Sequence, residues 1–121
     1  MRLEQFTEAH RPELHRLLGQ HDMPLMAVPK LGFAVMQDSR AAAMGFLRAV
    51  EGGSYMFDSL ISDNKLNSEQ RHQAMQLLWA KIINEANGAP IVGFSINNGT
   101  VNRALAAGFR AVAYTVLVHK G

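Results

Sequence analysis

The sequence contains no cysteine, and this absence excludes several classes of protein. Without thiols the chain forms no disulfide, holds no metal through thiolates and has no cysteine nucleophile. Long apolar runs are missing too, since the most apolar stretch, Ala41 to Leu47, is far shorter than the ~20 residues of a membrane span. The first residues, Met1 to Phe6, lack the apolar centre of a signal peptide. We therefore expect a cytosolic protein that makes no use of a membrane.

An excess of charge of one sign is also missing. Twelve Lys and Arg residues stand against 10 Asp and Glu, which gives a formal net charge of +2. The basic residues are scattered, whereas proteins that bind nucleic acid usually carry a dense basic stripe. No two of the five histidines have the i, i+4 spacing of a helical metal pair, and no serine has the context of a nucleophile elbow. We expect neither nucleic acid as the main ligand, nor a metal site, nor a serine hydrolase.

The residues that are present predict one α/β domain over positions 1–121, because 48% of them are hydrophobic and supply a core. Apolar periodicity and turn signals predict the element order β-α-β-β-β-α-β-α-β. The expected ranges are a short strand at 3–6, a helix from Thr7 to about Gly19, strands at 32–37, 41–50 and 55–62, a helix at 68–86, a strand at 90–96, a helix at 100–107 and a strand at 109–119. The last strand is apolar on both faces, as in the middle of a sheet. This order implies a mixed sheet with a right-handed crossover and helices on both faces.

Three local patterns in this order resemble the Gcn5-related N-acetyltransferase (GNAT) family over nearly the whole chain. Met44-Gly45-Phe46-Leu47 is similar to the family's third strand, and Leu60-Ile61-Ser62 to the point where its fourth strand meets the cofactor-binding helix. Asn97 followed by Gly108-Phe109 is similar to the family's last helix. The resemblance implies an acyl-CoA-dependent N-acyltransferase that moves an acetyl group from acetyl-CoA to an amine.

The resemblance also implies where acetyl-CoA would bind. Backbone groups of the fourth strand at Leu60 and Ile61 would hold the acyl carbonyl and the pantetheine arm. Asn97 would contact the pantetheine, or else serve as an Asx turn or cap for the last helix. The pyrophosphate would sit at the start of the long helix, where unpaired N–H groups favour an anion. The corresponding residues here are Ser68, Gln70, Arg71 and His72, although Arg71 and His72 also suit a solvated helix face.

The sequence departs from the family at the cofactor end. Positions 65–74 contain no glycine, where the family has the pattern Arg/Gln-x-x-Gly-x-Gly/Ala. One register puts Gln73 and Met75 at the glycine positions, another puts Ala74 and Gln76 there, and Glu69 adds a negative charge. These side chains would crowd the phosphates.

The catalytic groups are also incomplete. Ala104 stands where many members carry a tyrosine that protonates the departing thiolate. Tyr55 and Tyr114 are the only phenols, and we expect Tyr114 in the core. Asp58 is the candidate general base, because a partly buried carboxylate has a raised pKa; the alternative is a solvated or paired strand residue.

Two functions therefore remain open. The first is the N-acyltransferase, with an unknown amine as its substrate. The second is a catalytically degenerate GNAT-like protein that binds a protein partner or serves in assembly. GNAT-like proteins without the glycine loop also occur among bacteriophage proteins encoded near tail and internal virion genes, and Ser62-Asp63-Asn64 before the long helix resembles the same segment in those proteins. A homo-oligomer is compatible with either function.

Overall fold

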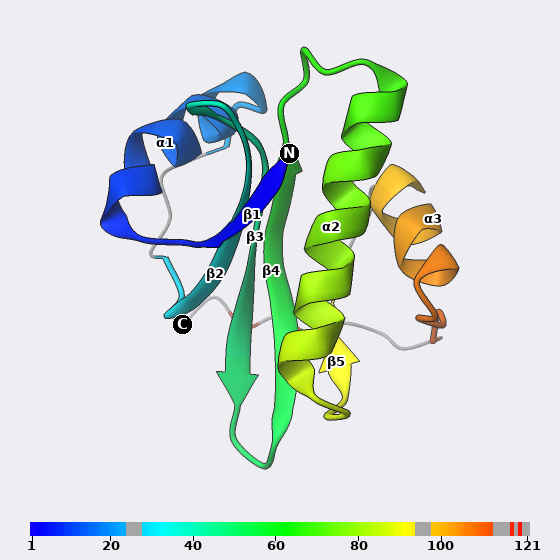
Figure 1. Ribbon diagram of the computed structural model, residues 1–121. Coiled ribbons are helices and arrows are strands. Elements are labelled where there is room, and N and C mark those ends of the chain that lie inside the picture. Colours follow the sequence, from blue (N-terminus) through cyan, green and yellow to red (C-terminus); the bar gives the residue numbers. More distant parts are fainter. Residues whose placement is uncertain (24–27, 94–97, 113–116, 118, 120–121) are drawn as a thin grey trace.

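The computed structural model describes residues 1–23, 28–93, 98–112, 117 and 119. The elements run, in order, β1 (Arg2–Gln5), the 3-10 turn η1 (Glu8–His10), α1 (Arg11–Gln20), β2 (Leu31–Gln37), β3 (Arg40–Val50), β4 (Ser54–Ser62), α2 (Ser68–Ala86), β5 (Ile91–Val92) and α3 (Asn98–Ala106). This order confirms the predicted α/β class (Figure 1). Of the predicted last strand, 109–112 have no regular structure, and most of the remainder lies outside the described residues.

The strands form one mixed sheet in the order β1-β2-β3-β4-β5. The first three pairings are antiparallel, and β4 pairs with β5 in parallel. Positive φ values of 101° at Gly52 and 93° at Gly53 explain the turn between β3 and β4, because glycine adopts such angles without strain. The predicted meander followed by a crossover through α2 is therefore confirmed.

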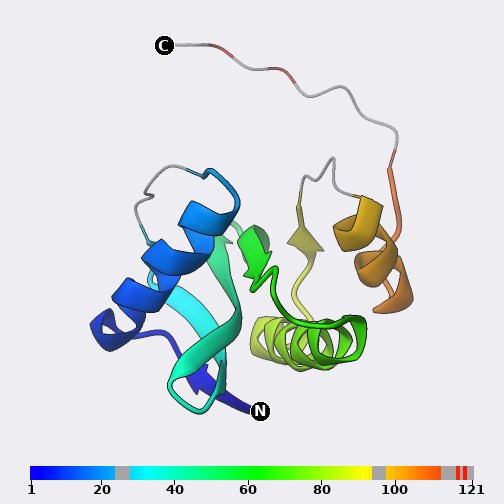
Figure 2. The ribbon, with the colours of Figure 1, turned by 90° about the horizontal axis from the view of Figure 1, so that it is seen from above.

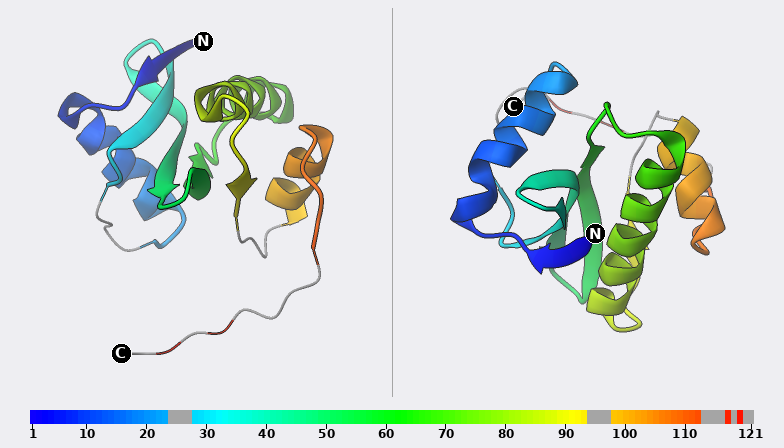
Figure 3. Two further views of the ribbon diagram at one scale, coloured as in Figure 1. Left: turned by 90° about the horizontal axis from the view of Figure 1, so that it is seen from below. Right: turned by 45° about the horizontal axis from the view of Figure 1, so that its top comes forward.

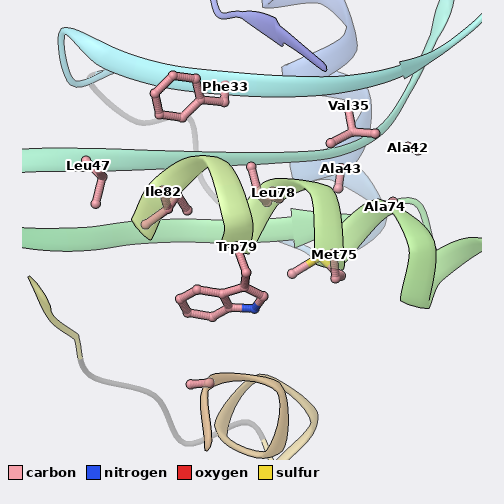
Figure 4. Packing of buried hydrophobic residues seen from close by; sticks show 11 residues of the cluster. Phe33, Val35, Ala42, Ala43, Leu47, Ala74, Met75, Leu78, Trp79 and Ile82 are labelled. Carbon is pink, nitrogen blue, oxygen red and sulfur yellow. The ribbon is translucent and has the colours of Figure 1, made fainter. Parts of the chain in front are cut away.

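Helices cover both faces of this sheet (Figures 2 and 3). On one face, Leu14, Leu17 and Leu18 of α1 are buried against a cluster that includes Met44 and Phe46. On the other face, α2 packs its apolar stripe onto the strands. Figure 4 shows Leu78 between α2 and the strands, whereas Trp79 projects toward α3. Each face thus has its own core, with the sheet between them.

The apolar stripe of α2 differs from the prediction at one position. Ile83 is 38% exposed, whereas Ile82 is fully buried and Ala74 joins the core. A helix turns about 100° per residue, so the buried arc that contains Leu78, Trp79 and Ile82 ends before Ile83, which lies at its edge. Within the described ranges, none of the helices has the length and apolarity required to cross a bilayer.

Candidate functional site

An irregularity in β4 opens the middle of the sheet. Met44 pairs with Ile61 and Phe46 pairs with Asp58, so β4 uses one more residue than β3 between these pairs. This is a β-bulge opposite Gly45, and a bulge leaves its extra residue outside the hydrogen-bond ladder. A Cβ on Gly45 would lie 2.5 Å from Leu60 Cδ2, which explains the glycine there.

The described part of the neighbouring strand, β5, ends before it reaches the bulge. Within the described residues, β5 pairs with β4 through Tyr55–Ile91 and Met56–Val92. Among the described residues, no strand pairs with β4 on this side from Phe57 to Ser62. In the described part of the chain, the backbone N–H and C=O groups of the bulged stretch therefore have no strand partner on this side, which we call the β4 gap.

The predicted residues of β4 lie at this gap, but their side chains have different surroundings. Leu60 packs with the core on the α2 face, and Ile61, 6% exposed, packs with the core on the α1 face. Only their backbone can serve a ligand. The backbone of Asp58 pairs with Phe46 at the edge of the bulge, while its side chain lies outside the described part of the structure.

A buried carboxylate ties the segment after β4 to α1. Asp63 is 6% exposed. It accepts hydrogen bonds from Arg16 Nη1 at 3.1 Å, Gln20 Nε2 at 3.0 Å and the Lys65 N–H at 2.9 Å. Burial opposes ionisation, but the Lys65 N–H, the Gln20 amide and the Arg16 guanidinium outweigh it and hold the pKa of Asp63 below its ordinary value.

Glu13 extends this network to the start of β3. Its carboxylate accepts two hydrogen bonds from Arg16, each of 2.9 Å, and one of 2.7 Å from the Ala41 N–H. The Arg16 guanidinium lowers the pKa of Glu13, burial opposes this, and the Ala41 N–H adds to the lowering. Helix α1 is thus fastened to β3 and to the segment that leads into α2, which the sequence did not predict.

The start of α2 is closed by its own hydrogen bonds. Asn67 Oδ1 accepts the Gln70 N–H at 2.8 Å, and Gln70 Oε1 accepts the Asn67 N–H at 3.1 Å, which together form a capping box. From Asp63 to Arg71, seven of nine N–H groups have an acceptor within the protein, namely those of Asp63, Asn64, Lys65, Leu66, Asn67, Gln70 and Arg71. Only the N–H groups of Ser68 and Glu69 remain for an external anion among these residues.

The other predicted phosphate residues do not converge on that anion position. Arg71 Nη2 donates to the Leu66 carbonyl at 3.1 Å, and His72 is exposed. Positions 73–76, where the two registers of the resemblance put the family's glycines, lie within the regular helix α2 beyond its first turn, with Ala74 and Met75 in the core. A pyrophosphate therefore does not fit here as the resemblance implies, since few amides are free and Glu69 repels it.

An aromatic cluster absent from the prediction fills the space between α2, α3 and β4. The ring centres of Phe57 and Trp79 lie 5.3 Å apart, and those of Trp79 and Phe109 lie 5.1 Å apart. Gly93 packs directly against the Phe57 ring, where any Cβ would collide with it. Trp79 Nε1 is buried and finds no acceptor in the part of the chain that the structure describes. The position expected for the acid, Ala104, belongs to the same core.

Two further expectations lie outside the described residues, namely the contact from Asn97 and the core position of Tyr114. A hollow of about 250 Å³ lies between the β2–β3 turn and the segment before α2, where Asp38, Arg40, Asp63 and Lys65 line it. It does not include the bulge residues. Over the described ranges, no three His, Asp or Glu side chains gather as metal ligands would.

Known structures share this architecture. An aminoglycoside N-acetyltransferase, AAC(6')-Iy, in complex with CoA, superposes with a TM-score of 0.70 at 18% identity over 99% of each chain. Glucosamine-6-phosphate N-acetyltransferase from Arabidopsis thaliana gives 0.68 at 9% identity, over 99% of this chain and 98% of that one. A GNAT-family acetyltransferase from Staphylococcus aureus gives 0.70 at 8% identity, over 93% and 85%. The sequence itself matches no family model and no curated protein. The likeness to these solved structures shows that the chain has the fold of the GNAT acetyltransferases.

Proposed function

We propose that the protein is an N-acyltransferase that moves an acetyl group from a thioester donor to an amine. The observation that carries the proposal is the bulged stretch of β4, which among the described residues has no strand neighbour from Phe57 onward, in a fold shared with N-acetyltransferases. Free backbone groups there suit an extended amide-rich arm and an acyl carbonyl, because an extended ligand pairs with exposed strand backbone.

The reaction requires a nucleophile, a base and stabilisation of the carbonyl oxygen. The amine nitrogen attacks the thioester carbon, a C–N bond forms, and the C–S bond breaks. The sulfur leaves as a thiolate and takes up the proton that the nitrogen releases, through a base and water. Asp58, at the edge of the bulge, is the proposed base. Backbone N–H groups of the bulge would stabilise the developing oxyanion.

The test is acetyl transfer measured by mass spectrometry. Acetyl-CoA and S-acetylpantetheine are offered as donors to an aminoglycoside, glucosamine 6-phosphate and a lysine-containing peptide. Asp58→Asn should lower the rate by about 100-fold, as expected for the loss of a general base. Asp38→Asn is the matched control, because Asp38 is exposed in the β2–β3 turn and should leave the rate unchanged.

The second candidate is a GNAT-fold protein without catalysis, which serves as a protein-binding or bacteriophage assembly module. The closed start of α2 and the alanine at position 104 favour it, because each removes a named part of the acetyltransferase chemistry. Transfer to any amine that Asp58→Asn abolishes would contradict this candidate. Absence of both binding and transfer with every donor would contradict the acyltransferase.

A further inference from the structure

The start of α2 presents almost no free N–H groups, and this limits its ability to bind the phosphates of an acyl-donor molecule. A phosphate at a helix start is held by several backbone N–H groups that converge on it. Here most of those groups between Asp63 and Arg71 already have acceptors, and two of the acceptors, Gln70 Oε1 and Asn67 Oδ1, hold each other's N–H. Binding a phosphate would break bonds that the protein has made.

Two of the acceptors belong to α1 and β3, so the N–H groups before α2 are held by the surrounding fold and not by the loop alone. The Asn64 N–H donates to Gln20 Oε1 of α1 at 3.0 Å, and the Asp63 N–H donates to the Ala42 carbonyl of β3 at 2.9 Å. Asp63 itself is held by Arg16 and Gln20. Opening the segment would therefore disturb α1 and β3 as well.

The charges at the same place point the same way. Glu69 lies exposed in the first turn of α2, beside one of the two N–H groups that remain. The guanidinium of Arg71 is directed to the Leu66 carbonyl at 3.1 Å. A carboxylate in the first helical turn favours the helix dipole but repels a phosphate that approaches the same N–H groups.

The gap beside β4 is a different case, because no strand in the described part of the chain covers its backbone. The bulge leaves an extra residue outside the ladder, and within the described ranges β5 supplies no partner beyond Met56. We infer that the protein recognises its acyl donor through the acyl-pantetheine arm alone, without the pyrophosphate and adenosine of CoA. This inference rests on the proposed function. Two sources carry that arm, a free pantetheine thioester and the prosthetic arm of an acyl carrier protein.

Binding and transfer are both measured, so the inference does not depend on the acceptor amine. Calorimetry with S-acetylpantetheine and with acetyl-CoA should give dissociation constants within about threefold of each other. Adenosine 3′,5′-bisphosphate should neither bind nor compete. Acetyl-CoA bound more than about tenfold tighter than S-acetylpantetheine would overturn the inference and leave the acyltransferase proposal standing. If no thioester binds or reacts, both are overturned.

A third arm of the experiment separates the two sources. Acetylated acyl carrier protein that reacts at least about tenfold more efficiently than S-acetylpantetheine identifies the carrier-borne arm, and equal efficiency identifies the free thioester. Either result supports the inference, provided acetyl-CoA shows no advantage over S-acetylpantetheine.

A pair of variants tests the closure itself. Asn67→Gly removes the acceptor from the Gln70 N–H while glycine remains an adequate N-cap. It should raise affinity for acetyl-CoA several-fold and leave S-acetylpantetheine binding unchanged. Asn87→Gly, the same substitution at the other end of α2, is the matched control and should change neither affinity. If Asn67→Gly does not raise the affinity for acetyl-CoA, the hydrogen-bonded start of α2 is not what prevents phosphate binding.

Discussion

Two glycines show how differently the same residue type can be constrained in this chain. Gly93 follows β5 directly and packs against the ring of Phe57. Gly19 lies near the end of α1, and a methyl group there would meet no atom within 4 Å. The first glycine is required by packing, whereas the second only weakens its helix.

Alanine at these two positions should therefore have opposite effects. Gly93→Ala should lower the free energy of unfolding by about 1–3 kcal/mol, because the Phe57 ring must shift within the aromatic cluster. Gly19→Ala should raise it by about 0.5 kcal/mol through better helix propensity. Urea unfolding followed by circular dichroism measures both, and equal effects would contradict the packing assigned to Gly93.

Asp63 is the residue on which the polar network converges, and its charge is testable separately from its shape. Asp63→Asn keeps the size of the side chain but leaves Arg16 without the partner at 3.1 Å. We expect a loss of about 2–3 kcal/mol in unfolding free energy, since one member of a largely buried pair is removed. Asp38→Asn, exposed in a turn, should change stability by less than about 0.5 kcal/mol. If Asp63→Asn also costs less than about 0.5 kcal/mol, the polar network adds no stability.

At the scale of elements, the sequence predicted most of what is local. The ends of α2 were predicted at Ser68 and Ala86 because a capping residue precedes the helix and a glycine follows it. The meander was predicted because alternating strands are joined by tight turns. The N-cap assigned to Asn67 or Ser68 is confirmed for Asn67, which is outside the helix in extended backbone.

What could not be predicted depends on partners distant in sequence. The bulge in β4 exists only relative to the register with β3, and nothing in 54–62 alone announces an extra residue. The closure of the α2 start needs a side chain from Gln20, which lies 44 residues before its partner. The signal available in hindsight was Gly45, a small residue in the middle of an apolar strand.

The cap of α2 yields a prediction at this scale. Asn67→Ala removes the acceptor of the Gln70 N–H and should lower the unfolding free energy by about 1 kcal/mol. Asn87, at the other end, has a left-handed φ of 48°, so Asn87→Gly should raise stability by about 0.5–1 kcal/mol. Thermal unfolding of the two variants checks the signs. A stabilising Asn67→Ala would contradict the capping box.

For the whole molecule, the carboxylates that bind α1 to the sheet predict a dependence of stability on pH. The pKa values of Glu13 and Asp63 are lowered from ordinary values of 4.5 and 3.8. Their stabilisation is therefore complete above those ordinary values and is lost as the pH falls through the lower, folded values. The midpoint of urea unfolding should fall steeply on acidification below about pH 4.

The contribution of Asp63 can be isolated from this acid transition. Asp63→Asn should show a shallower fall over the same pH range than the unsubstituted protein, because one of the protonating groups is gone. Stability that rises on acidification, or an unchanged slope in the variant, would contradict the assignment.

The internally satisfied start of α2 also constrains the evolutionary history open to this chain. Placing glycine at Gln73 alone would loosen the helix without freeing an N–H group, because that residue lies in the second turn. A phosphate site would need several substitutions, and each early one removes a bond before any new affinity rewards it. Selection acting on single changes would therefore meet a fitness valley before a phosphate site could form.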